Sequence, residues 1–134
     1  MAPSHAGGCL CGAVRYRVTG EPLSSVICHC ASCRRASGAA TVAWVTFSRT
    51  CFEILAGKPA VFHSSPGVAR QFCGLCGSAL TYEKADSPGS IDVTTGTLDE
   101  PGEFPPTAEV WLEDRLHWQP TDQNLDHYAG STSD

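Results

Sequence analysis

Seven of the eight cysteines fall into three short clusters whose spacing suits metal binding. One cluster is C-x-C, one is C-x-C-x-x-C and one is C-x-x-C-G. Thiolates two or three positions apart in a tight turn can face a common ion, and neighbouring glycines allow the backbone angles of such turns. The pattern therefore predicts zinc binding. The clusters are Cys9 and Cys11, then Cys28, Cys30 and Cys33, and then Cys73 and Cys76.

Zinc takes four tetrahedral protein ligands in structural sites, but three protein ligands and an open position in catalytic sites. Seven clustered cysteines therefore divide into a set of four and a set of three. The simplest partition joins the two pairs into one closed site and leaves the triplet to hold a second zinc with one open position. The predicted structural ligands are Cys9, Cys11, Cys73 and Cys76, and the predicted catalytic-zinc ligands are Cys28, Cys30 and Cys33.

Cys51 stands outside the clusters and leaves the nature of the second site open. It begins a short strand-like segment, and a free cysteine is often a buried apolar residue, so we expect it in the core. If it instead supplied a fourth thiolate to the triplet, both sites would be purely structural. An iron–sulfur cluster is a further alternative, because sets of cysteine thiolates also hold iron.

The segments that position these turns have the pattern of short β-strands. Val14, Tyr16 and Val18 alternate with Arg15 and Arg17, which is typical of a half-buried strand. Prolines interrupt the remaining sequence and would break long helices. We therefore expect an all-β fold with zinc-binding turns and very little helix. Strands are predicted at 12–18, 23–27, 40–47, 51–55, 60–63, 68–72, 79–82, 91–95 and 109–112, and one helical turn at 32–37.

The length of 134 residues, with 42% hydrophobic and 17% charged residues, is ordinary for one soluble globular domain at 1–134. No apolar run approaches the roughly 18 residues that a membrane span needs, and the first eight residues lack the features of a signal peptide. A cytoplasmic protein with reduced thiols and no membrane partner is therefore predicted. The formal charge of -5 argues against a nucleic-acid partner.

Four motifs occur in an order that is far more specific than any single C-x-x-C pair. They are Gly8-Cys9-Leu10-Cys11-Gly12-Ala13-Val14-Arg15-Tyr16, Cys28-His29-Cys30-Ala31-Ser32-Cys33-Arg34-Arg35, Phe72-Cys73-Gly74-Leu75-Cys76-Gly77-Ser78 and Gly96-Thr97-Leu98-Asp99. Together they resemble the glutathione-dependent formaldehyde-activating enzyme (GFA) and CENP-V family over about residues 7–118. We expect these residues to form the core of the domain. Residues 119–134 are then a C-terminal tail, and its last six residues should fray. The resemblance implies tent-like, twisted antiparallel sheets with two zinc ions on the cysteine sets given above.

The resemblance also implies a carbon–sulfur lyase that forms or cleaves an S-hydroxymethyl or related thiol adduct, with glutathione as the thiol and formaldehyde as the aldehyde. Zinc coordination would favour the ionised, nucleophilic form of a substrate thiol, whose pKa is about 8.5 when free. A non-catalytic zinc-dependent glutathione carrier or binding module, which would hold the same metals, and a structural zinc protein are the alternatives.

Few residues other than the cysteines can be given a role. Arg34 directly follows the triplet and is the candidate for pairing with an anionic substrate, although a solvated helical position is the alternative. His29 belongs to the residue type best suited to general-base catalysis near neutral pH, but a residue between two ligands usually points away from the metal. The basic residue that such family members often carry before the Phe-Cys pair is present as Arg70.

Overall fold

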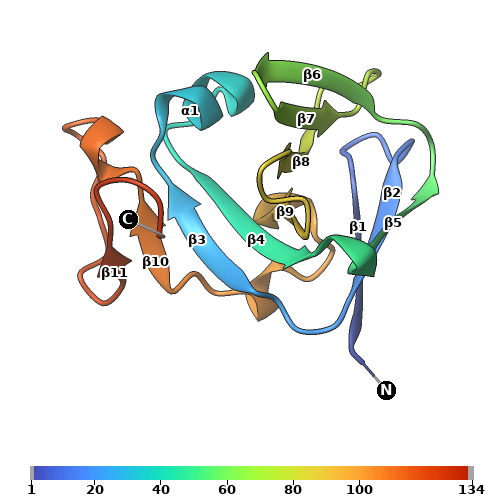
Figure 1. Cartoon of the computed structure of the whole chain (residues 1–134), viewed down its shortest axis with the longest axis horizontal. Coiled ribbons are helices and arrows are strands. Elements are labelled where there is room, and N and C mark those ends of the chain that lie inside the picture. Colours follow the sequence, from blue (N-terminus) through green and yellow to red (C-terminus); the bar gives the residue numbers. More distant parts are fainter. Residues whose placement is uncertain (1, 133–134) are drawn as a thin grey trace.

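The structure, a computed structural model, describes residues 2–132 and consists mainly of β-strands (Figure 1). A small sheet has the strand order β1-β2-β5, and a larger sheet has the order β11-β10-β3-β4-β9-β8-β7-β6. The strands are β1 (Ser4–Gly8), β2 (Arg15–Thr19), β3 (Ser24–Cys28), β4 (Val42–Ser48), β5 (Phe52–Ala56), β6 (Ala60–Ser65), β7 (Val68–Phe72), β8 (Ala79–Lys84), β9 (Ser90–Thr94), β10 (Ala108–Val110) and β11 (Asp126–His127).

Helical structure is confined to short segments, so the predicted all-β class with very little helix is confirmed. Within residues 2–132 the one α-helix, α1 (Ala31–Ser37), has 7 residues and ends at Gly38, whose φ of 72° lies in the left-handed region. No helix in this range has the length and apolar character needed to cross a membrane. The described part of the chain also has four 3₁₀ turns: η1 (Arg49–Cys51), η2 (Thr95–Thr97), η3 (Pro101–Glu103) and η4 (Leu112–Asp114).

The strand pairs are antiparallel except at β10, which runs parallel to both β3 and β11. The antiparallel arrangement implied by the family resemblance therefore describes most, but not all, of the larger sheet. The parallel pairing brings Ala108 beside Val26 and Val110 beside Cys28. A segment from the last third of the chain thus lies directly against the strand that leads into the cysteine triplet.

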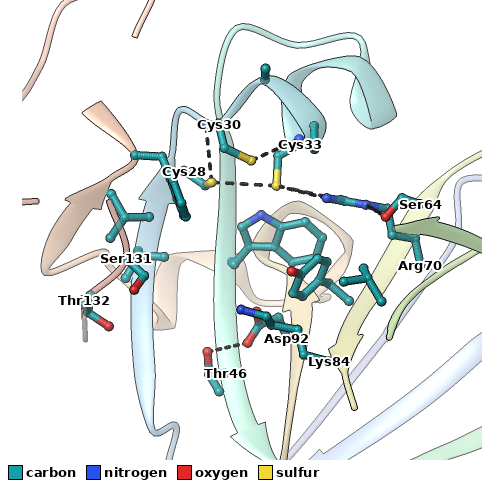
Figure 2. Close-up of a pocket in the computed structure, with 18 of the residues that line it drawn as sticks. Cys28, Cys30, Cys33, Thr46, Ser64, Arg70, Lys84, Asp92, Ser131 and Thr132 are labelled. Carbon is teal, nitrogen blue, oxygen red and sulfur yellow. Dashed lines mark hydrogen bonds between the residues drawn. The ribbon is translucent and has the colours of Figure 1, made fainter. Parts of the chain in front are cut away.

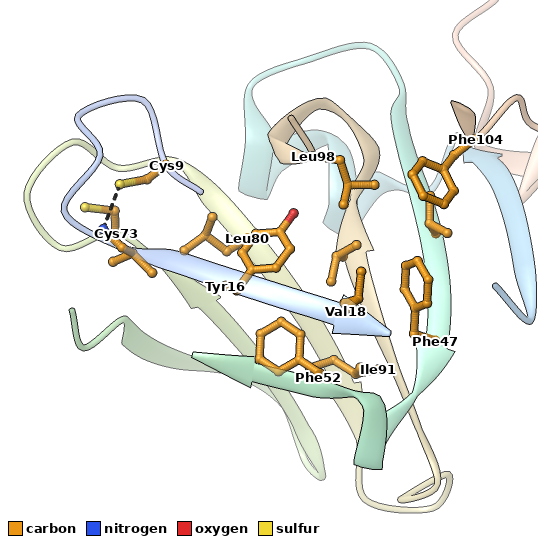
Figure 3. Close-up of a cluster of buried hydrophobic side chains, with 13 residues drawn as sticks. Cys9, Tyr16, Val18, Phe47, Phe52, Cys73, Leu80, Ile91, Leu98 and Phe104 are labelled. Atoms are coloured by element: carbon orange, nitrogen blue, oxygen red, sulfur yellow. Dashed lines mark hydrogen bonds between the residues drawn. The ribbon is translucent and has the colours of Figure 1, made fainter. Parts of the chain in front are cut away.

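A buried apolar core lies between the two sheets (Figure 3). The alternation predicted around Tyr16 is confirmed, since Tyr16 and Val18 of β2 are fully buried and Arg17 is exposed. The Tyr16 ring stacks on Phe52 with centroids 5.5 Å apart, and its hydroxyl lies 2.8 Å from Thr97 Oγ1. At one end of this core lie two cysteines, Cys9 and Cys73, so the closed cysteine set adjoins the main hydrophobic core.

Two strands were not predicted, and both lack the usual sequence signal. β1 has the sequence SHAGG, which has neither alternation nor β-branched residues. A Cβ on Gly7 would lie 2.4 Å from the Tyr16 ring, so close packing on β2 requires glycine where a strand-forming residue would otherwise signal the strand. β11 has only 2 residues and lies in the expected tail. Farther along the tail, the carbonyl of Gly130 accepts a hydrogen bond from the backbone N–H of Trp111 at 2.9 Å. The described residues 129–132 are therefore held against the domain, while 133–134 lie outside the described residues.

Candidate metal centres and substrate cavity

Four cysteine sulfurs converge between the small sheet and the larger sheet. Cys9 and Cys11 come from the β1–β2 turn, and Cys73 and Cys76 come from the β7–β8 turn. Their sulfur atoms all lie within 4.8 Å of one another, with 3.6 Å between Cys9 and Cys11 and 3.8 Å between Cys11 and Cys73. The spacing and the soft, all-sulfur donor set suit a closed tetrahedral zinc site. We call these four residues the closed cysteine group.

Hydrogen bonds favour the ionised form of two sulfurs in the closed cysteine group, those of Cys76 and Cys9. The Ser78 hydroxyl lies 3.1 Å from Cys76 Sγ and lowers the pKa of Cys76 to about 5. The backbone N–H of Val14 donates to Cys9 Sγ at 3.3 Å and lowers the pKa of Cys9. Because a metal binds the thiolate and not the thiol, these donors prepare the group for a cation.

The second cysteine group is assembled where β3 ends and α1 begins. Cys28 is the last residue of β3, Cys30 caps the helix by accepting a hydrogen bond from Cys33 N at 3.2 Å, and Cys33 lies in the first turn. All three sulfurs lie within 4.8 Å of one another. Hydrogen bonds with Cys28 and Cys33 lower the pKa of Cys30, so the group favours at least one thiolate. We call these three residues the cysteine triad.

Cys51 belongs to neither group of sulfurs. It ends η1, where its carbonyl accepts a hydrogen bond from the Thr19 hydroxyl at 3.2 Å, beside the small sheet. Among residues 2–132, the cysteine triad therefore has no fourth cysteine, which is the arrangement expected of a zinc site with an open position and not of a closed four-thiolate site. Cys51 is half-buried and belongs to neither buried hydrophobic cluster, so the expected core position is not confirmed.

A cavity of about 400 Å³ opens beside the cysteine triad (Figure 2). Its walls come from strands β3, β4 and β6 to β10 of the larger sheet, from the start of α1 and from the C-terminal segment. Trp44 and Val26 provide apolar surface, and several hydroxyl and charged groups provide polar surface. The lining residues include Cys28, Cys30, Cys33, Ser24, Thr46, Arg70, Tyr82, Lys84 and Asp92.

Arg70 supplies the positive charge nearest to the cysteine triad. Its side chain is buried, and both terminal nitrogens donate toward Cys33 Sγ at 3.7 Å. The guanidinium is oriented by a hydrogen bond from Nε to Ser64 Oγ at 3.1 Å and by the Tyr82 ring, whose centroid lies 4.8 Å from Cζ. These contacts hold Arg70 in one orientation, from which its charge stabilises thiolate in the triad.

Arg34, the arginine predicted from sequence to meet the substrate, lies half-buried on α1 and is not among the cavity-lining residues. Its proposed role stays a prediction. The sequence identifies Arg70 only as a residue type that family members often carry. A second sequence signal could have marked Arg70 as a site residue: it shares one face of the predicted strand at 68–72 with Val68 and Phe72, and a charged residue on a buried face is unusual without a partner.

The His29 side chain points away from the cavity, as expected of a residue between two metal ligands. It is 1% exposed and its Nε2 lies 2.7 Å from Oε1 of the buried Glu109 in β10. The other Glu109 oxygen accepts a hydrogen bond from Asp122 N at 2.6 Å. His29 and Glu109 thus connect the loop that carries the triad to β10 and to the segment before β11.

Comparison with known proteins bears on the family and the fold of this chain. The family model described as "Glutathione-dependent formaldehyde-activating enzyme" matches residues 4–114, which include both cysteine groups. A crystal structure of a Rhodobacter sphaeroides protein has a similar fold, with a TM-score of 0.61 and 21% sequence identity over 92% of this chain and 98% of that chain. At this identity the second comparison bears on the fold alone.

Proposed function

The chain belongs to the glutathione-dependent formaldehyde-activating enzyme family, and from this we propose that it is a zinc-dependent carbon–sulfur lyase. It would form or cleave the S-hydroxymethyl adduct, or a related adduct, of a small thiol, with glutathione as the thiol. We further propose one zinc on the closed cysteine group and one on the cysteine triad, in a reducing cytoplasm that keeps the thiols free.

One observation carries the proposal: three converging sulfurs line a cavity of about 400 Å³, and among residues 2–132 no fourth cysteine lies beside them. A closed structural site would need no cavity. A volume of this size accommodates a small organic ligand, whose surface would be largely buried there. A zinc ion held by Cys28, Cys30 and Cys33 would favour the ionised, nucleophilic form of a substrate thiol in that cavity.

The residues around the triad support the same chemistry. Arg70 faces Cys33 and offsets negative charge on sulfur, so that the thiolate of a substrate can approach the triad. Trp44 and Val26 reduce contact with water, which strengthens these electrostatic interactions. In the forward direction the substrate sulfur attacks the aldehyde carbon, a carbon–sulfur bond forms and the carbonyl oxygen takes up a proton. In the reverse direction the hydroxyl proton leaves and the same bond breaks.

The test is the rate at which glutathione and formaldehyde equilibrate with S-hydroxymethylglutathione, measured by NMR exchange with and without the zinc-loaded protein. We expect acceleration above the spontaneous rate, loss of that acceleration in Cys30→Ser, and retention in the matched control Cys51→Ser. Glutathione binding with no acceleration would replace the lyase by a carrier, and acceleration that survives Cys30→Ser would place the chemistry elsewhere.

A further inference from the structure

The end of the cavity away from the cysteine triad carries a carboxylate and an ammonium group, from Asp92 and Lys84 (Figure 2). Strand register sets this position. Ser24 pairs with Thr46, Thr46 pairs with Asp92, and Asp92 pairs with Tyr82, so four strands place a row of polar side chains along one wall. Nothing in the cysteine chemistry requires that row.

Hydrogen bonds in the row all run toward Asp92. The Ser24 hydroxyl donates to Thr46 Oγ1 at 2.9 Å, and the Thr46 hydroxyl donates to Asp92 Oδ1 at 2.6 Å. Within residues 2–132, Asp92 Oδ2 has no hydrogen-bond donor, and Lys84 acts on the carboxylate through its charge without forming an ion pair with it. Burial raises the pKa of Asp92, whereas the hydrogen bond from Thr46 and the charge of Lys84 lower it. The carboxylate thus has an acceptor site unfilled in the cavity.

The separation between the two ends of the cavity limits the length of the ligand. Cys28 ends β3 and Ser24 begins it, so four residues of extended chain, roughly 13 Å at about 3.3 Å per residue, separate the triad from the polar row. Free cysteine has only three bonds between its sulfur and its amino nitrogen and cannot reach both ends. A thiol of peptide length can.

We propose that Asp92, oriented by Thr46, and Lys84 form a subsite for the α-amino-acid group of a peptide-length thiol whose sulfur lies at the cysteine triad. Asp92 accepts hydrogen bonds from the ligand ammonium, and Lys84 pairs with the neighbouring ligand carboxylate. The subsite rests on the proposed function, because it deepens the substrate class of the same cavity. It makes the protein selective for thiols that carry both groups at a distance from sulfur.

The experiment is calorimetric titration of the zinc-loaded protein with three probes. They are glutathione, its analogue glutaryl-cysteinylglycine, in which hydrogen replaces the ammonium group, and 2-mercaptoethanol, which has neither group. Because hydrogen bonds to charged groups are among the stronger ones, glutathione should bind about tenfold or more tightly than the analogue. Asp92→Asn should remove this preference and leave 2-mercaptoethanol binding unchanged. Lys84→Met should weaken both peptide thiols equally, since both keep the carboxylate.

The matched control is Asp86→Asn, because Asp86 is exposed in the β8–β9 turn and does not line the cavity. Equal binding of glutathione and the analogue to the unaltered protein would overturn the subsite, and this comparison needs no variant to fold. A preference that persists in Asp92→Asn would also overturn it. Binding of 2-mercaptoethanol without such a preference would refute the subsite alone, whereas binding of none of the three thiols would overturn the proposed function with it.

Discussion

At the scale of single residues, Arg70 is the side chain whose removal should most affect chemistry without affecting metal binding. Its guanidinium contacts Cys33 but comes from β7, outside the turns that carry the cysteines. We expect Arg70→Met to reduce turnover by about 10- to 100-fold, because a charged hydrogen bond contributes about 1.5–3 kcal/mol. Metal content, measured by atomic absorption, should stay at two ions per chain.

The matched variant is Arg34→Met, which tests the arginine predicted from sequence. Arg34 shares the charge and size of Arg70 but does not line the cavity. A smaller effect in Arg34→Met than in Arg70→Met would give the electrostatic role to Arg70. An equal or larger loss of turnover in Arg34→Met would contradict the role inferred from the contact between Arg70 and Cys33, and would assign that role to Arg34. Arg70→Lys adds a further comparison, because lysine keeps the charge but lacks the planar fork that points both nitrogens at Cys33.

At the scale of elements, β1 depends on a glycine that packs against an aromatic ring. A methyl group on Gly7 would lie 2.4 Å from the Tyr16 ring and 2.6 Å from the Thr97 carbonyl, and Tyr16 is fully buried and cannot move aside. Gly7→Ala should therefore destabilise the protein by about 1–3 kcal/mol, the typical cost of overpacking. Urea unfolding of the zinc-loaded protein measures this difference.

Gly96→Ala is the control, since a methyl group at Gly96 meets nothing within 4 Å and its backbone is not in the left-handed region. It should leave the unfolding midpoint nearly unchanged. Equal midpoints for the two variants would mean that β1 can shift away from β2, and that the close approach at Gly7 does not limit stability.

Gly7 also illustrates why part of the fold could not be predicted from the sequence. Strands such as β2 were predictable because one buried face imposes alternation on neighbouring residues. β1 was not, because contact with Tyr16 selects glycine, which carries no strand signal. The cysteine groups were predictable because metal-ligand spacing is local within each turn. The polar row was not, since Thr46, Tyr82 and Asp92 meet only through the register of separate strands.

At the scale of the whole molecule, the two cysteine groups differ in which parts of the fold they connect. The closed cysteine group joins the β1–β2 turn of the small sheet to the β7–β8 turn of the larger sheet. The cysteine triad lies within a single segment, from the end of β3 to the first turn of α1. A metal ion in the closed group would therefore restrain the relative positions of the sheets, whereas one in the triad would mainly restrain a loop.

Three cysteine variants separate these roles. Structural zinc contributes about 10–16 kcal/mol of binding free energy, which equals or exceeds the roughly 5–15 kcal/mol by which a domain is usually stable, so Cys76→Ser should fail to fold. Cys30→Ser should keep the fold and lose one of two zinc ions, because all three sulfurs of the triad come from one short segment of the chain. Cys51→Ser should keep both ions, because Cys51 lies in neither group. Circular dichroism measures folding and zinc analysis measures metal content in the purified variants.

A folded Cys76→Ser protein that unfolds at the same temperature as Cys51→Ser would show that sheet packing around Tyr16 and Phe52 is sufficient to stabilise the fold without the closed group.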